Sequence, residues 1–128
     1  MKHPERRGAP RIAQHVPLKV GYHQNEWVTH TKNISATGAY CTVTQYLDPM
    51  TRIKVRLELP ARRSAAAQVV TGQGVVVRVE PPIPTPRRRS YHIAIFFQEM
   101  PARGRAILAR YVQEHLKTQA GKHLVVQQ

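Results

Sequence analysis

The 128-residue sequence is poor in acidic residues, and this shortage excludes several classes of protein. It has seven Asp and Glu against 20 Lys and Arg, and Asp48 is the only aspartate. Calcium loops, magnesium–carboxylate sites and paired-carboxylate hydrolases need clustered acids. The glutamates are scattered along the chain. We therefore expect no site of these kinds and no enzymatic activity that depends on one.

Cysteine and long apolar runs are also scarce. The single cysteine, Cys41, cannot form an internal disulfide and is interpreted as a small buried apolar residue. One cysteine and scattered histidines offer no metal-ligand spacing, so we expect neither a metal nor a cofactor. Residues 1–7 are polar, unlike a signal peptide, and runs such as Val75–Val77 are too short to span a membrane. These features favour a soluble, cytoplasmic protein.

The abundant residues are basic. The formal net charge of +13 indicates an anionic partner, which could be nucleic acid, a nucleotide or an anionic membrane. Charge does not distinguish among these three. Only 6% of the residues are aromatic, which is few for stacking bases along a nucleic-acid strand.

Apolar and polar residues alternate with a period of two through most of the chain, and this pattern is typical of half-buried antiparallel strands. Arg52–Leu59 is the clearest example. The predicted strands cover residues 16–22, 27–34, 39–44, 52–59, 68–79 and 91–97. Gly72 and Gly74 predict a bend or bulge in the fifth. Six strands at this spacing predict a small barrel or sandwich in one domain.

Two segments depart from the alternation. Pro81–Pro86, followed by Arg87–Arg89, cannot form a strand interior because proline donates no ladder hydrogen bond, and it predicts a long hairpin tip. After Pro101 the apolar residues follow a helical period, which predicts one C-terminal helix packed on the barrel. The domain is expected to span residues 12–118, with residues 119–128 as a tail.

Two short motifs stand out. The first is the basic segment Arg6–Arg11, which by itself could be a solvated arm. The second is Asn33–Gly38, with the pattern Asn-x-Ser-x-x-Gly, which by itself could be a polar turn. They lie one predicted strand apart, with the barrel pattern around both.

Together, these motifs resemble the PilZ domain, a bacterial receptor module for the second messenger cyclic di-GMP. Arg7–Arg11 matches the family's Arg-x-x-x-Arg motif, and Asn33–Gly38 matches its Asp/Asn-x-Ser-x-x-Gly motif. Val76–Val79, Ala94–Phe97 and Arg105–Tyr111 are similar to its fifth strand, final strand and C-terminal helix. The resemblance implies a six-stranded antiparallel β-barrel with one C-terminal α-helix.

The resemblance also implies a ligand site. It assigns Arg6, Arg7 and Arg11 to the phosphates and guanines of cyclic di-GMP, Asn33, Ser35 and Gly38 to the floor of the site, and Arg78 to a further contact. In the family, an additional arginine such as Arg6 often accompanies two intercalated ligand molecules. This chain departs from the family at Asn33, where aspartate is commoner, at Ala94, where glycine is frequent, and in its longer, more basic hairpin tip.

The residue types suit this ligand. The planar arginine fork binds phosphate or the guanine edge through two parallel hydrogen bonds, and its face stacks on a base. If the alternation continues through the turn, Asn33 and Ser35 project outward and Ile34 points to the core. Gly38, without a side chain, would let the base approach the backbone closely.

The composition of residues 1–11 predicts a flexible basic arm that becomes ordered when ligand binds and so presents a new surface to an effector protein. The effector is not identified by the sequence. Two alternatives remain open. One is a basic barrel that binds nucleic acid, and the other is a degenerate PilZ adaptor that does not bind cyclic di-GMP.

Overall fold

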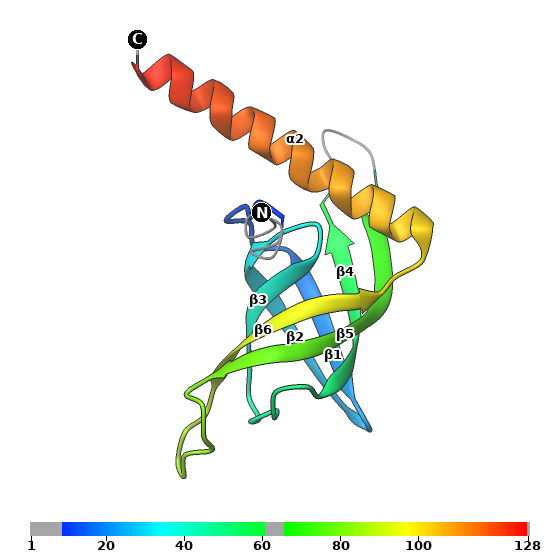
Figure 1. The fold of residues 1–128 in the computed structure, drawn as a ribbon, viewed down its shortest axis with the longest axis vertical. Coiled ribbons are helices and arrows are strands. Elements are labelled where there is room, and N and C mark those ends of the chain that lie inside the picture. The colour runs from blue at the N-terminus through cyan, green and yellow to red at the C-terminus, as the bar shows by residue number, and fades with distance from the viewer. Residues whose placement is uncertain (1–8, 61–65, 128) are drawn as a thin grey trace, which may run out of the picture.

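The computed structural model describes residues 9–60 and 66–127, with side chains described through Thr118. It contains six strands and one long helix (Figure 1). These are β1 (Pro17–Tyr22), β2 (Asn25–Ile34), β3 (Gly38–Val43), β4 (Arg52–Leu59), β5 (Gln68–Glu80), β6 (Tyr91–Glu99) and α2 (Ala102–Gln127). Each strand lies within a few residues of the range that the alternation predicts.

The strands form a closed barrel in the order β1-β2-β3-β6-β5-β4. Every neighbouring pair is antiparallel, including the β1–β4 pair that closes the barrel. The prediction of a six-stranded antiparallel barrel is confirmed, and the sandwich alternative is excluded. Closure leaves each strand hydrogen-bonded on both sides, so the barrel has no open sheet edge.

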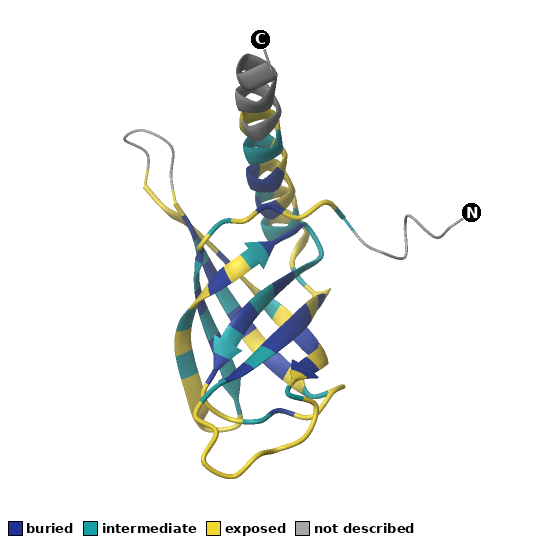
Figure 2. Ribbon diagram, turned by 90° about the vertical axis from the view of Figure 1, so that its left-hand side faces the viewer, coloured by how far each residue is buried: buried dark blue, intermediate teal, exposed yellow. Residues whose placement is uncertain are grey.

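Most of the core lies inside the barrel and comes from alternate residues of the strands (Figure 2), and the connections and α2 add further buried side chains. On β4, the buried side chains are Ile53, Val55, Leu57 and Leu59. Cys41 of β3 is also buried, and burial raises the pKa of its thiol to about 12. Its side chain therefore packs as an apolar group, as the sequence predicts.

The β5 strand is irregular, as the glycines predict. Its pairing register with β6 shifts between Gln73 and Gly74 and again between Val76 and Arg78. At Gly74, a Cβ atom would lie 2.7 Å from the Ile95 Cγ2 atom. Glycine at this position therefore lets β5 and β6 cross closely inside the barrel wall.

The two predicted exceptions to the strand pattern are both present. Residues 81–90 connect β5 to β6 as a long hairpin loop. Helix α2 packs on β5 and buries Leu108, Tyr111 and Val112. In the part of the chain that the structure describes, no helix is both long and apolar enough to span a membrane.

Helix α2 continues past Thr118 to Gln127, so the helix is longer than the apolar periodicity of the sequence indicates. The apolar stripe ends near Leu116, and Figure 1 shows the later turns extending beyond the barrel. An apolar stripe marks the part of a helix that has a face to bury.

Candidate functional site

Arg11 and Ile12, which precede β1, bring the two sequence motifs together. Ile12 and Ile34 exchange both backbone hydrogen bonds, with N–O distances of 2.9 and 3.0 Å, and the Ile12 side chain is buried. This bridge sets Arg11 beside the end of β2. The Arg11 guanidinium donates from Nη1 to Asn33 Oδ1 at 3.3 Å. Arg6 and Arg7 lie outside the described residues, so their placement stays a prediction.

The Asn-x-Ser-x-x-Gly motif forms the turn between β2 and β3, and Ser35 closes it. Ser35 Oγ accepts hydrogen bonds from the backbone N–H groups of Thr37 and Gly38, each at 3.1 Å. The Ser35 N–H donates to the Gly38 carbonyl at 2.8 Å. The expectation that Ser35 projects outward beside Asn33 is wrong, because Ser35 is only 4% exposed. The alternation ends at Ile34, where β2 ends and the turn begins.

Gly38 is required by the neighbouring strand. A Cβ atom at this position would overlap the carbonyl oxygen of Ile95 on β6. The Phe97 N–H, also on β6, donates to the Thr37 carbonyl at 2.8 Å. Thus the close approach that glycine permits here is between the turn and β6, whereas the sequence suggested an approach between backbone and ligand.

Asn33 begins a row of residues that crosses the outer wall of the barrel. Asn33 is paired with Tyr40 of β3, Tyr40 with Ala94 of β6, and Ala94 with Arg78 of β5. Directly paired residues in antiparallel strands share one face of the sheet. Ala94 carries only a methyl group, and across it the Arg78 Cζ atom lies 5.9 Å from the centre of the Tyr40 ring. The structure therefore brings Arg78 into line with Asn33.

Tyr40 is the centre of a polar cluster that the sequence analysis missed. Its hydroxyl donates to Glu80 Oε1 at 2.8 Å, and Arg78 Nε lies 3.5 Å from Glu80 Oε2. The His92 ring stacks against Tyr40 with 5.7 Å between centroids. A local signal could have found Tyr40. A hairpin that pairs Ile34 with Ala39 across the turn must also pair residues 33 and 40.

The charged groups of this row are two arginines and one glutamate. Partial burial raises the pKa of Tyr40, and its hydrogen bond to Glu80 raises it further, while Arg78 opposes the shift. The Tyr40 phenol therefore stays protonated and remains a donor at neutral pH. Arg11 and Arg78 lie at opposite ends of the row, and Glu80 is the carboxylate that contacts it. Within the residues described, no three metal-ligating side chains cluster.

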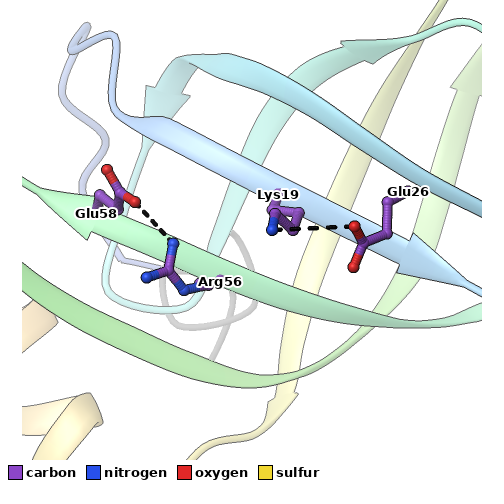
Figure 3. A network of polar contacts seen from close by, with 4 residues as sticks. All are labelled: Lys19, Glu26, Arg56 and Glu58. Carbon is purple, nitrogen blue, oxygen red and sulfur yellow. Dashed lines mark hydrogen bonds and ion pairs between the residues drawn. The ribbon is translucent and has the colours of Figure 1, made fainter.

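The opposite wall of the barrel carries an open groove of about 1080 Å³ between β1, β4 and β5. Its basic lining side chains are Lys19, His23, Arg52, Lys54 and Arg56. Two of them face carboxylates, as Figure 3 shows: Lys19 Nζ lies 3.9 Å from Glu26 Oε1, and Arg56 Nη1 lies 2.7 Å from Glu58 Oε2. This groove contains none of the site residues that the sequence predicts.

Comparison with known proteins identifies the fold. Residues 5–114 match the sequence profile of the PilZ domain family. The inhibitor of motility MotI/DgrA of Bacillus subtilis superposes with a TM-score of 0.71 at 16% identity over 89% of this chain. The PlzA protein of Borreliella burgdorferi, solved in complex with c-di-GMP, gives 0.53 at 13% identity over 91%. The chain spans about half of each protein, 52% and 53% respectively. No curated protein sequence matches it significantly.

Proposed function

Because this chain belongs to the PilZ domain family, we propose that it binds cyclic di-GMP on the outer wall of the barrel and signals to a partner protein. PilZ domains are receptors and adaptors rather than enzymes. The observation that carries the proposal is the hydrogen bond between Arg11 and Asn33. It joins the two family motifs on one surface, where a single ligand can contact both.

The arginines supply most of the binding energy in this proposal. The Arg11 fork, together with Arg6 and Arg7 of the arm, binds the two phosphates or the O6/N7 edge of guanine. Each bidentate contact contributes about 1–3 kcal/mol. Three such contacts could provide much of the ~8 kcal/mol of a micromolar complex. Lysine cannot replace arginine here because it lacks the planar fork.

The floor of the site presents polar groups and flat surfaces. The Asn33 amide nitrogen remains available to a guanine edge while its Oδ1 accepts from Arg11. Ser35 and Gly38 act indirectly, since they fix the turn that carries Asn33. At the far end of the row, the Tyr40 ring and the Arg78 guanidinium offer stacking surfaces to a second base.

We propose that the ligand also sets the position of the arm. Arg6 and Arg7 can contact a ligand held at Arg11 and Asn33 only if the arm lies over the barrel wall in the complex. This closure would form the surface that an effector protein recognises. Arg6 supports a complex of two intercalated ligand molecules per chain.

A calorimetric titration with cyclic di-GMP, with GTP as competitor, tests this function. We expect saturable binding that GTP does not compete away, and two ligands per chain. Arg11→Lys keeps the charge but removes the fork, so it should weaken binding at least tenfold. Arg103→Lys on α2 is the matched control and should bind like the wild type. Unchanged binding by Arg11→Lys would contradict the proposed site.

A nucleic-acid-binding function is a second candidate, and the basic groove on the opposite wall favours it. Sequence-independent binding depends on neutralised phosphates and falls steeply with salt. A titration with a single-stranded oligonucleotide would then be sensitive to Lys54→Gln and insensitive to Arg11→Lys. A folded protein that binds neither ligand would instead support the degenerate adaptor.

A further inference from the structure

The loop between β5 and β6 has a defined conformation that two buried or half-buried tyrosines hold. Tyr46 Oη donates to the Pro82 carbonyl at 2.8 Å, and the Thr85 N–H donates to Tyr91 Oη at 3.1 Å. The two tyrosine rings meet edge to face, with centroids 5.5 Å apart. The Arg88 N–H closes a turn on the Thr85 carbonyl at 3.1 Å. The loop therefore projects from the barrel in a conformation that these hydrogen bonds hold.

This projection presents positive charge to solvent. Arg87, Arg88 and Arg89 are all exposed, and no ion pair in the described part of the chain neutralises them. Arg88 Nε donates only to the Ser90 carbonyl, at 2.9 Å. Arg87 adopts a φ of 73°, a left-handed conformation that is uncommon for residues other than glycine. Such conformations persist where surrounding contacts impose them, and they concentrate at functional sites.

Exposed apolar side chains lie at the same end of the barrel. Ile83 in the loop is 67% exposed, and Met50 in the β3–β4 connection is 73% exposed. The hydrogen bond from Tyr46 to Pro82 ties these two connections together. Figure 1 shows both at the end of the barrel away from α2. We call Ile83 and Arg87–Arg89 together the basic tip, whereas Met50, whose N–H donates to the Val76 carbonyl at 2.6 Å, lies farther back along β5.

We propose that the basic tip docks this protein reversibly on an anionic lipid surface. Arginines beside exposed apolar side chains suit the boundary between headgroups and acyl chains. Pro82, Pro84 and Pro86 have no backbone N–H group. Fewer backbone donors therefore lose their hydrogen bonds to water when this segment approaches the boundary. A stable protein interface needs about 800 Å² of complementary surface per partner, whereas a lipid surface requires no shape complementarity, so a single projecting loop can dock on it.

The placement of the basic tip makes such docking compatible with the rest of the molecule. The tip lies at one end of the barrel, and α2 extends from the other (Figure 1). The arm joins the barrel beside the end of β2 that is close to α2, through the Ile12–Ile34 bridge. Docking through the tip would therefore leave both the arm and the helix facing the aqueous side.

Co-sedimentation of the full chain with vesicles tests the proposal. We expect the protein to bind vesicles of equal parts phosphatidylglycerol and phosphatidylcholine, and to leave pure phosphatidylcholine vesicles unbound. Attraction of about 1 kcal/mol per arginine corresponds to about fivefold in partitioning. The triple variant Arg87→Gln, Arg88→Gln, Arg89→Gln should therefore bind about 100-fold more weakly. Ile83→Ser, with unchanged charge, should weaken binding roughly tenfold.

A charge-matched control separates a specific tip from the general effect of net charge. Arg103→Gln, Arg110→Gln, Lys117→Gln removes three charges from exposed positions on α2 and should change binding by less than about threefold. Urea midpoints check that every variant is folded. Equal losses for the two triple variants would overturn the proposal, as would equal binding to both vesicle types. So would tip-dependent binding to soluble polyglutamate together with no effect of Ile83→Ser, which would indicate an acidic protein partner.

Discussion

At the β2–β3 turn, contacts of individual atoms restrict which residue types fit at positions 35 and 38. Gly38 lies against the Ile95 carbonyl on β6, and Ser35 uses its hydroxyl to accept two backbone N–H groups. These contacts give structural reasons for both residues in the ligand-free protein. A motif residue can therefore be necessary for binding without contacting the ligand.

Replacing Gly38 with alanine should destabilise the protein. The new methyl group would overlap a backbone oxygen that cannot move without disturbing β6, and overpacking of this kind costs about 1–3 kcal/mol. Urea denaturation measures the free energy of unfolding. Gly21→Ala on β1 is the matched control, because its Cβ would lie 3.7 Å from the nearest atom, an ordinary contact. Equal stability of the two variants would contradict this account of the turn.

Glu80 should oppose the binding of an anionic ligand. It holds the Arg78 guanidinium at 3.5 Å and places a negative charge on the row. Glu80→Gln keeps an acceptor for the Tyr40 hydroxyl but removes this charge. Because the pair is solvent-exposed, we expect the affinity for cyclic di-GMP to rise only about two- to fivefold. Glu58→Gln on the opposite wall is the control, and calorimetry that finds equal affinities for both variants would exclude the effect.

At the scale of the element, the strands were predictable and their contacts were not. Alternation located all six strands because each has one buried and one solvated face. The alignment of Tyr40 with Arg78 depends on β6 lying between β3 and β5, and on a register shift in β5. Neither is encoded locally. The orientation of Ser35 was mispredicted because the turn ends the alternation one residue earlier than assumed.

The packing of α2 on the barrel depends on its first half. Leu108 is fully buried, so Leu108→Ala should lower the free energy of unfolding by about 2–5 kcal/mol. Leu116 is only partly buried, and Leu116→Ala should cost distinctly less. Urea denaturation compares the two. Equal losses would indicate that the helix is held along its whole apolar stripe.

At the scale of the whole molecule, ligand binding should be visible as protection of the arm. Hydrogen exchange with and without cyclic di-GMP should show slower exchange in the complex for the amides of residues 5–9 and 11. The Ile12 amide, which already donates to Ile34, serves as an internal control and should change little. Unchanged exchange over residues 5–11 at saturating ligand would contradict closure of the arm.

The short connection between β6 and α2 links the angle of the helix to the position of β6. Only Met100 and Pro101 separate β6, which holds the β2–β3 turn, from the first residue of the helix. The 26 residues of α2 correspond to an axis of about 39 Å. A tilt of about 10° at the strand–helix junction would then displace the distal terminus by roughly 7 Å. The length of the helix thus converts a small change of angle at the barrel rim into a displacement of several ångströms at its distal end.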